Sequence, residues 1–209
     1  MPIHSLTNIL DTSSEIPQCN NSLIIKETDN SNKKGTLEKI IIENLNCSQL
    51  CSHKLDHHPI TSPYLDKTNN SGINKGADAI AVIEKNNKEY LLFFELKSFK
   101  VNTGEVADKF FASTSLIHYL NLLMEKFYNK SFNNFDAAAI LFSTRQKVTR
   151  IKKFGIRPDI PQINKLNYSN SAGKNIQVLE ISKNSGSEIK ISLDKILNQL
   201  RTKKFKNWP

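Results

Sequence analysis

The sequence predicts one α/β domain built around a mixed central sheet flanked by helices. Two stretches dense in apolar and aromatic residues, 77–84 and 89–97, indicate two strands joined by a tight turn at Asn86 and Asn87, because asparagine tolerates the positive φ angles of such turns. From about 104 to 128, apolar residues recur at helical spacing and predict a long amphipathic helix. The next apolar stretch, 135–142, has the composition of a strand buried on both faces.

The remaining segments predict fewer regular elements. Helical spacing predicts a first helix over about 36–46, whose apolar residues are Leu37, Ile40, Ile41, Ile42 and Leu45. A strand over 176–182 and a closing helix over 192–200 are expected later in the chain. We expect a long connection over 47–75 and an irregular basic stretch over 143–174. The expected organisation is a weakly ordered segment 1–34, a domain over 35–200 and a basic tail over 201–209.

Composition and charge restrict the class of protein. Of the 209 residues, 38% are hydrophobic and 23% are charged, which excludes collagen-like and disordered chains for most of the length. The sequence shows neither an apolar run of the ~20 residues that span a membrane nor a secretory signal, and three cysteines are too few for a disulfide framework. We therefore expect a cytoplasmic protein without a membrane partner. The net charge of +9 favours a nucleic acid partner, although solvated lysines give the same balance.

The predicted hairpin brings ionisable side chains together. If Asn86 and Asn87 form the turn, Asp78 lies directly opposite Glu95, and opposed residues point to the same face with Cβ atoms about 4.5–5.5 Å apart. Lys97 follows Glu95 by two residues and shares that face. We expect the three side chains at one end of the hairpin, on the face that the bulk of the long helix leaves uncovered. The alternative is a surface hairpin in which Lys97 forms one salt bridge with a carboxylate.

Two facing carboxylates suit a hard divalent cation, because they repel each other unless a cation lies between them. Mg²⁺ commonly takes one or two protein carboxylates and leaves its other positions to water and phosphate. A lysine beside such an ion can orient or deprotonate a water molecule and can stabilise charge on a phosphate. These groups are the ones needed for metal-assisted hydrolysis of a phosphodiester.

The segments GADAI (76–80) and FELK (94–97), each on its strand between two helices, resemble the PD-(D/E)xK nuclease superfamily, which has the restriction-endonuclease-like fold. The resemblance covers about residues 36–143, which it identifies as an αβββαβ-type core with one strand not identified. Ala77 stands where the nominal motif has proline. It implies that Asp78 and Glu95 bind Mg²⁺, or Mn²⁺ in its place, and that the Leu96 carbonyl adds a ligand. Lys97 is by the same resemblance the catalytic lysine.

The family often adds a glutamate from the first helix, and the two candidates here are Glu38 and Glu43. We prefer Glu38, since on a helix it shares a face with Ile41, Ile42 and Leu45 and points toward the sheet.

The resemblance also implies a function. The expected activity is Mg²⁺-dependent endonucleolytic cleavage of DNA, as in a type II restriction enzyme or a defence-associated nuclease. A homodimer is expected, because cutting both strands with one site per chain usually takes two chains. Three alternatives stay open: a structure-selective nuclease such as a junction resolvase, a non-specific toxin-like nuclease, and a catalytically inactive nucleic-acid-binding protein of the same fold. The sequence does not separate DNA from RNA as the substrate.

Basic residues supply candidates for contact with the DNA backbone. Lys109 lies on the long helix that follows the FELK strand. This helix often borders the metal site in relatives, so Lys109, Ser113 and Ser115 are candidates to face that site. The others lie in the irregular basic stretch and are Arg145, Lys147, Arg150, Lys152, Lys153 and Arg157.

A second group has residue types that bind zinc. Its members are Cys47, Cys51, His53, His57 and His58. Their spacing is not that of a standard zinc finger, so we do not expect a structural zinc, and the sequence leaves the matter open.

Overall fold

The computed structural model describes residues 9–10, 12–26, 37–55, 76–98, 101–144, 160–184 and 186–208. The larger of two mixed sheets has the strand order β4-β5-β6-β7-β9-β8, and β11 pairs with the start of β7. Its elements, with the long helix, are β4 (Gln49–Lys54), β5 (Ala79–Lys85), β6 (Lys88–Ser98), α2 (Thr103–Tyr128), β7 (Asp136–Thr144), β8 (Gln162–Ser169), β9 (Asn175–Lys183) and β11 (Lys203–Lys204). We call this sheet the main sheet.

The second sheet has four strands in the order β1-β2-β3-β10. It and the remaining short helices comprise η1 (Thr12–Ser14), β1 (Gln18–Cys19), β2 (Ser22–Lys26), β3 (Lys39–Glu43), β10 (Glu188–Ser192), α3 (Leu193–Leu197) and η2 (Phe205–Asn207). Strands β3 and β10 are parallel, whereas β1 with β2 and β2 with β3 are antiparallel. No helix in the described ranges has the length and apolar character needed to cross a membrane.

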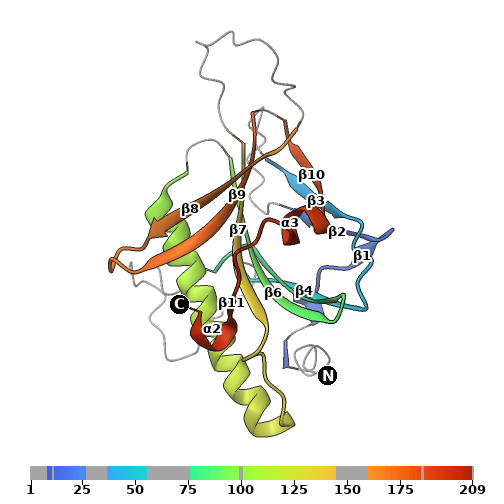
Figure 1. The fold of residues 1–209 in the computed structure, drawn as a ribbon, viewed down its shortest axis with the longest axis vertical. Coiled ribbons are helices and arrows are strands. Elements are labelled where there is room, and N and C mark those ends of the chain that lie inside the picture. The colour runs from blue at the N-terminus through green and yellow to red at the C-terminus, as the bar shows by residue number, and fades with distance from the viewer. Residues whose placement is uncertain are drawn as a thin grey trace.

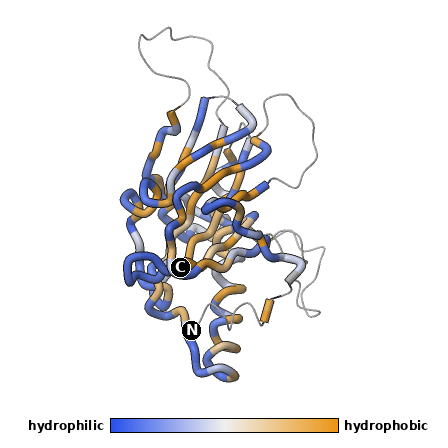
Figure 2. The backbone as a smooth tube through the Cα atoms, turned by 90° about the vertical axis from the view of Figure 1, so that its right-hand side faces the viewer, coloured by the Kyte–Doolittle hydropathy of each residue, from blue (hydrophilic) through white to orange (hydrophobic). Residues whose placement is uncertain are grey.

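The fold has three layers, with the main sheet in the middle (Figure 1). Helix α2 covers one face of the main sheet through residues such as Val106, Phe110 and Met124. The second sheet and α3 cover the other face, where Ile40 and Ile42 of β3 are buried. Figure 2 shows the apolar residues concentrated in the strands at the centre of the molecule. The prediction of a mixed α/β fold is therefore confirmed, but a sheet takes most of the place expected for a second flanking helix layer.

The predicted hairpin is confirmed together with its register. Asn86 and Asn87 form the turn with φ angles of 53° and 58°, the left-handed values that this type of turn requires. Ala79 pairs with Phe94 and Lys85 with Lys88, so the next position of the same register places Asp78 against Glu95. Strand β4 extends the hairpin to three antiparallel strands. The chain then crosses through α2 to β7, which is parallel to β6.

Helix α2 matches its prediction closely because local signals fix both of its ends. The Asn102 side chain caps the first turn by accepting from the Glu105 N–H, and Asn129 ends the helix in the left-handed conformation with a φ of 52°. Strands β7 and β9 likewise cover the stretches predicted for them.

The predicted helix over 36–46 is wrong. Residues 39–43 form strand β3 instead, in which Ile40 and Ile42 are buried while Lys39 and Glu43 are half-buried. Three consecutive isoleucines are compatible with either pattern, and their branched Cβ atoms favour a strand. Pairing with distant segments decides in favour of the strand, since β3 lies between β2 and β10 in the second sheet.

Four further expectations need correction. The segment 1–34, expected to be weakly ordered, contributes strands β1 and β2, and the connection 47–75 contains β4. The basic stretch 143–174 contains strand β8, while its residues 145–159 lie outside the described part of the chain. The closing helix is shorter than the predicted 192–200, since α3 spans only Leu193–Leu197. It follows β10, a strand that the sequence did not predict.

The basic tail packs against the main sheet. Phe205 is fully buried and stacks on His118, with ring centroids 4.2 Å apart. Trp208 stacks on Phe93 of β6 at 4.8 Å. These two aromatic side chains belong to the core beneath α2, so the tail completes the packing against β6.

Trp208→Ala is therefore expected to lower the free energy of unfolding by about 3 kcal/mol, the loss typical of a large aromatic side chain removed from a core. Urea unfolding followed by circular dichroism measures this value. The matched control is Phe127→Ala, because Phe127 is 77% exposed and its loss should change stability by no more than about 0.5 kcal/mol. Equal stability of the Trp208 variant and the parent protein would show that the tail does not support the core.

Candidate active site

Asp78 directly precedes β5 and Glu95 lies near the end of β6, and Lys109 from the start of α2 contacts both residues. Both carboxylates are buried, with 7% and 0% of their surface exposed. The Leu96 N–H donates to Asp78 Oδ2, which fixes the aspartate against the end of β6. The sequence prediction that the hairpin register opposes these two residues is thus confirmed.

Two lysines approach the carboxylates. Lys109 Nζ lies 2.6 Å from Glu95 Oε1 and 3.5 Å from Asp78 Oδ1. Lys97 Nζ lies 3.3 Å from the same Glu95 oxygen and 3.2 Å from Glu105 Oε1. Lys97 comes from β6, whereas Lys109 and Glu105 come from the first two turns of α2. The site is therefore a charge network between the end of a strand and the start of a helix.

The face that carries this network differs from the expectation. The same face of β5 and β6 presents Ile80 and Phe93, which pack beneath α2. Glu95 and Lys97 thus lie on the helix-covered face, and the first turns of α2 form one wall of the site. The reason is the short connection from β6 to α2, which places Glu105 and Lys109 directly over the strand end.

Glu95 is the most strongly perturbed group of the site. Burial and the nearby Asp78 raise its pKa to about 8, against the lowering effects of Lys109 and Lys97. Its Oε1 forms ion pairs with Lys97 and Lys109, while its buried Oε2 has no hydrogen-bond partner among the described residues. A buried carboxylate oxygen without a donor is costly in a folded protein and suits a position where a ligand supplies the missing interaction.

The raised pKa of Glu95 has a consequence for stability. Between pH ~4.5 and ~8 the folded protein keeps a proton on Glu95 that the unfolded chain releases. Raising the pH through this window without metal should therefore lower the free energy of unfolding. The measurement compares the wild type with Glu95→Gln by urea unfolding from pH 5 to pH 9. As the pH rises, the free energy of unfolding of the wild type should fall relative to that of Glu95→Gln. The same pH dependence in both proteins would contradict the raised pKa of Glu95.

Neighbouring side chains fix the position of the network. The Ser113 hydroxyl accepts from the Ala77 N–H at 2.7 Å and so anchors the main chain next to Asp78. Ser115, considered with it, is exposed and donates to the Phe111 carbonyl in its own helix. Of the two serines, only Ser113 contributes to the geometry of the site.

A buried glutamate on β9 extends the polar surface and escaped the sequence analysis. Strand pairing aligns Glu95 of β6 with Leu141 of β7 and with Glu180 of β9. Ser143, in the next row toward the strand ends, donates to Glu180 Oε1 at 3.0 Å. Glu180 is 4% exposed. Its position could not be derived from its own segment, because it depends on β7 and β9 being neighbours in the sheet.

The donor set fits a magnesium ion. Asp78 and Glu95 offer hard carboxylate oxygens, one of which is buried without a partner. Groups of three or more His, Cys, Asp or Glu residues that could hold a metal do not occur in the described ranges. Two carboxylates are sufficient for Mg²⁺, which commonly completes its shell with water and phosphate. The carbonyl of Leu96, the residue between Glu95 and Lys97, remains the candidate for a further ligand of the ion.

The other predicted site residues are placed as follows. Glu38 precedes β3 of the second sheet, is exposed, and donates its N–H to the Ser187 carbonyl. It is therefore not the inward-facing helix residue that was predicted, because its segment forms a strand on the other side of the main sheet. Glu43 ends the same strand, paired with Ser192. The candidates for DNA contact in the basic stretch lie outside the described residues; they are Arg145, Lys147, Arg150, Lys152, Lys153 and Arg157.

The zinc-type residues do not form one group among the described positions. Cys51 and His53 are buried on the α2 side of the main sheet, where Cys51 Sγ lies 3.1 Å from His53 Nε2. His53 Nδ1 lies 2.9 Å from Ser14 Oγ, and burial lowers the pKa of His53. Cys47 packs against the core on the opposite side. His57 and His58 lie outside the described residues.

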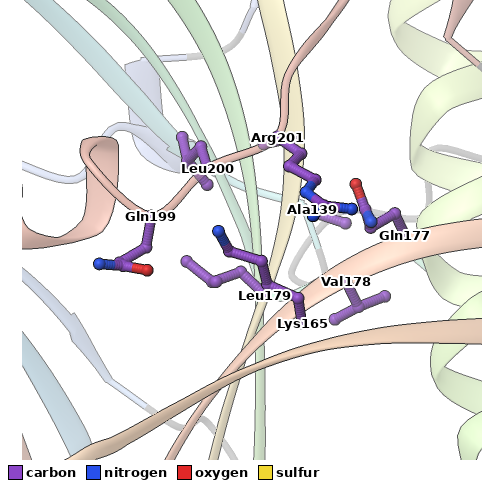
Figure 3. Close-up of a pocket in the computed structure, with 9 residues that line it drawn as sticks. Ala139, Lys165, Gln177, Val178, Leu179, Gln199, Leu200 and Arg201 are labelled. Atoms are coloured by element: carbon purple, nitrogen blue, oxygen red, sulfur yellow. The ribbon is translucent and has the colours of Figure 1, made fainter.

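A small pocket lies away from this site (Figure 3). The ends of Lys165, Gln177, Gln199 and Arg201 border it, from β8, β9 and the segment after α3. Leu179, which also lines it, belongs to the core beneath the second sheet. The pocket is therefore separate from the Asp78–Glu95 network.

Comparison of the chain with family models, with curated proteins and with solved structures finds no match.

Proposed function

We propose that this protein is a metal-dependent endonuclease that hydrolyses phosphodiester bonds of DNA and belongs to the PD-(D/E)xK superfamily. The observation that carries the proposal is the meeting of Asp78, Glu95 and Lys97 at one end of a hairpin. The two carboxylates are buried, and a lysine from α2 joins them. A structural salt bridge does not need two buried carboxylates, since one exposed pair forms at little cost.

The order of elements also supports the proposal. Strands β4, β5 and β6 form an antiparallel meander, and α2 then leads to β7, parallel to β6. This strand–strand–strand–helix–strand order is compatible with the core that the resemblance implies, and we assign β4 as the core strand that the sequence does not identify. The first helix of that core has no counterpart among the described residues, where β3 occupies the corresponding part of the chain.

The residues divide the work of hydrolysis as follows. Asp78 and Glu95 would hold the divalent ion, which when bound would supply Lewis acidity and help to activate a water molecule. Lys97 points its ammonium into the site and can orient or deprotonate the attacking water or stabilise charge on the phosphate. Glu105 contacts Lys97 and limits the positions of its flexible side chain. The proximity of α2 excludes bulk water from Glu95, which is fully buried.

Incubation of the purified protein with supercoiled, linear and branched DNA and with RNA, in Mg²⁺ or in EDTA, tests the function. Cleavage in Mg²⁺ but not in EDTA is expected. Discrete fragments from linear DNA indicate a restriction-type enzyme, selective cutting of branches indicates a structure-selective nuclease, and complete degradation indicates a non-specific one. Binding of DNA without any cleavage would contradict the proposal and leave the inactive nucleic-acid-binding alternative.

The DNA-binding part of the proposal makes a separate prediction. Replacing Arg150, Lys152 and Lys153 with alanine should weaken binding to all DNA sequences about equally and reduce the salt dependence of binding, because phosphate contacts release counterions without distinguishing bases. Fluorescence anisotropy at several salt concentrations measures both effects. Loss of affinity for one sequence alone, or unchanged binding, would contradict a role in backbone contact.

A further inference from the structure

Lys109 holds a position that its role in a basic DNA-binding surface does not explain. Its ammonium contacts both carboxylates of the candidate site, at 2.6 Å from Glu95 Oε1 and 3.5 Å from Asp78 Oδ1. Its side chain is only 16% exposed. Lys97 differs, because it contacts Glu95 and also the half-exposed Glu105 on α2. Lys109 is thus the lysine that bridges the two proposed metal ligands.

A cation in this place has a clear electrostatic role. Asp78 and Glu95 face each other in a buried setting, where their mutual repulsion is weakly screened. An ammonium that touches both reduces this repulsion and keeps the two side chains directed at one point. A divalent ion held by both carboxylates would compete with the Lys109 ammonium for the same oxygens and would repel it.

We infer that Lys109 is an internal counter-cation, which keeps the carboxylate pair assembled without metal and which the arriving divalent ion displaces. This inference rests on the proposed function, since it assumes that Asp78 and Glu95 bind the ion. Lys109 is then a positioning residue that sets metal affinity, because each binding event must first break its contacts with the carboxylates. Its four-carbon stem on α2 lets the ammonium move while the helix stays in place.

Isothermal titration with Mg²⁺ tests the inference, using the wild type, Lys109→Met and Lys109→Arg. The titrations are run at pH 9, above the pKa of about 8 for Glu95. The methionine variant should bind Mg²⁺ more tightly, by about 10-fold or more, because the ion then displaces no ammonium from the carboxylates. It should also unfold at a lower temperature without metal and recover more stability on Mg²⁺ addition. The arginine variant keeps the charge and should bind like the wild type.

Lys126→Met is the matched control, because Lys126 is exposed near the other end of the same helix. It should leave Mg²⁺ affinity unchanged. If the wild type binds Mg²⁺ and Lys109→Met binds it equally or more weakly, the counter-cation role is wrong while the proposed function stands. If neither protein binds Mg²⁺, the proposed function fails and the inference fails with it.

A measurement on the unaltered protein covers the case in which Lys109→Met does not fold. Brief acetylation with an N-hydroxysuccinimide ester, followed by mass spectrometry, reports the accessibility of each lysine amine. Saturation with Mg²⁺ should increase the acetylation of Lys109 several-fold relative to Lys126, since the displaced ammonium leaves its buried contacts. Unchanged or reduced acetylation of Lys109 at saturating Mg²⁺ would overturn the inference.

Discussion

Asp78→Asn and Glu95→Gln are each expected to abolish Mg²⁺-dependent DNA cleavage while leaving DNA affinity largely intact. Either change removes one of the two carboxylates that we propose to bind the ion but preserves side-chain size. The residues proposed to contact the phosphates, such as Arg150, Lys152 and Lys153, are other residues of the chain. Cleavage of supercoiled plasmid measures the first effect, and fluorescence anisotropy in Ca²⁺ or EDTA measures the second.

Glu89→Gln is the matched control for these variants. Glu89 lies on the same strand as Glu95 but at the turn end of the hairpin, paired with Glu84. Its replacement should leave cleavage unchanged. Full activity in both Asp78→Asn and Glu95→Gln would exclude the carboxylate pair as the metal site, whatever the activity of the control.

Lys97→Met is expected to reduce the rate of cleavage by about 10²–10⁴-fold, the range for loss of a positioned acid–base group. The metal should still bind, because both carboxylates remain. Single-turnover cleavage with saturating Mg²⁺ gives the rate, and calorimetric titration gives the metal affinity. A lowered rate with unchanged metal affinity separates the function of Lys97 from that of Lys109, whose removal is expected to strengthen metal binding.

Lys88→Met provides the comparison on the same strand. Lys88 is exposed at the turn, where it pairs with Lys85, and it is remote from Glu95. Its loss should leave the cleavage rate unchanged. If Lys97→Met cleaved as fast as the wild type, Lys97 would be only a salt-bridge partner of Glu105 and Glu95.

The hairpin that carries Asp78 and Glu95 was predictable because its determinants are local. Two asparagines fix the turn, and the turn fixes which residues face each other along both strands. Helix α2 was predictable for a similar reason, since its apolar period and its Asn102 cap lie within one continuous segment. In contrast, the isoleucines of β3 satisfy a helical and an extended pattern equally well. Their strand depends on β2 and β10, which are distant in sequence.

The site was predictable to the same extent as its secondary structure. Asp78, Glu95 and Lys97 follow from the hairpin alone. The bridging contacts of Lys109 depend on how α2 packs over β6, and the place of Glu180 depends on the neighbour relation of β7 and β9. Neither the packing of α2 over β6 nor the pairing of β7 with β9 can be predicted from a local sequence pattern. The expectation for Glu38 failed because it depended on the helix that proved to be β3.

The parallel pairing of β3 with β10 affects how the chain can acquire its structure during synthesis. Lys39 pairs with Glu188, so the second sheet joins segments separated by about 150 residues, a contact order that slows folding. Residues 205–208 supply the aromatic rings that pack beneath β6 and α2. The hairpin with Asp78 and Glu95, and the helix α2 that covers one of its faces, therefore leave the ribosome before β10 completes the second sheet on the other face. The stacking of Trp208 on Phe93 of β6 has to wait for the last twenty or so residues of this sequence to be translated.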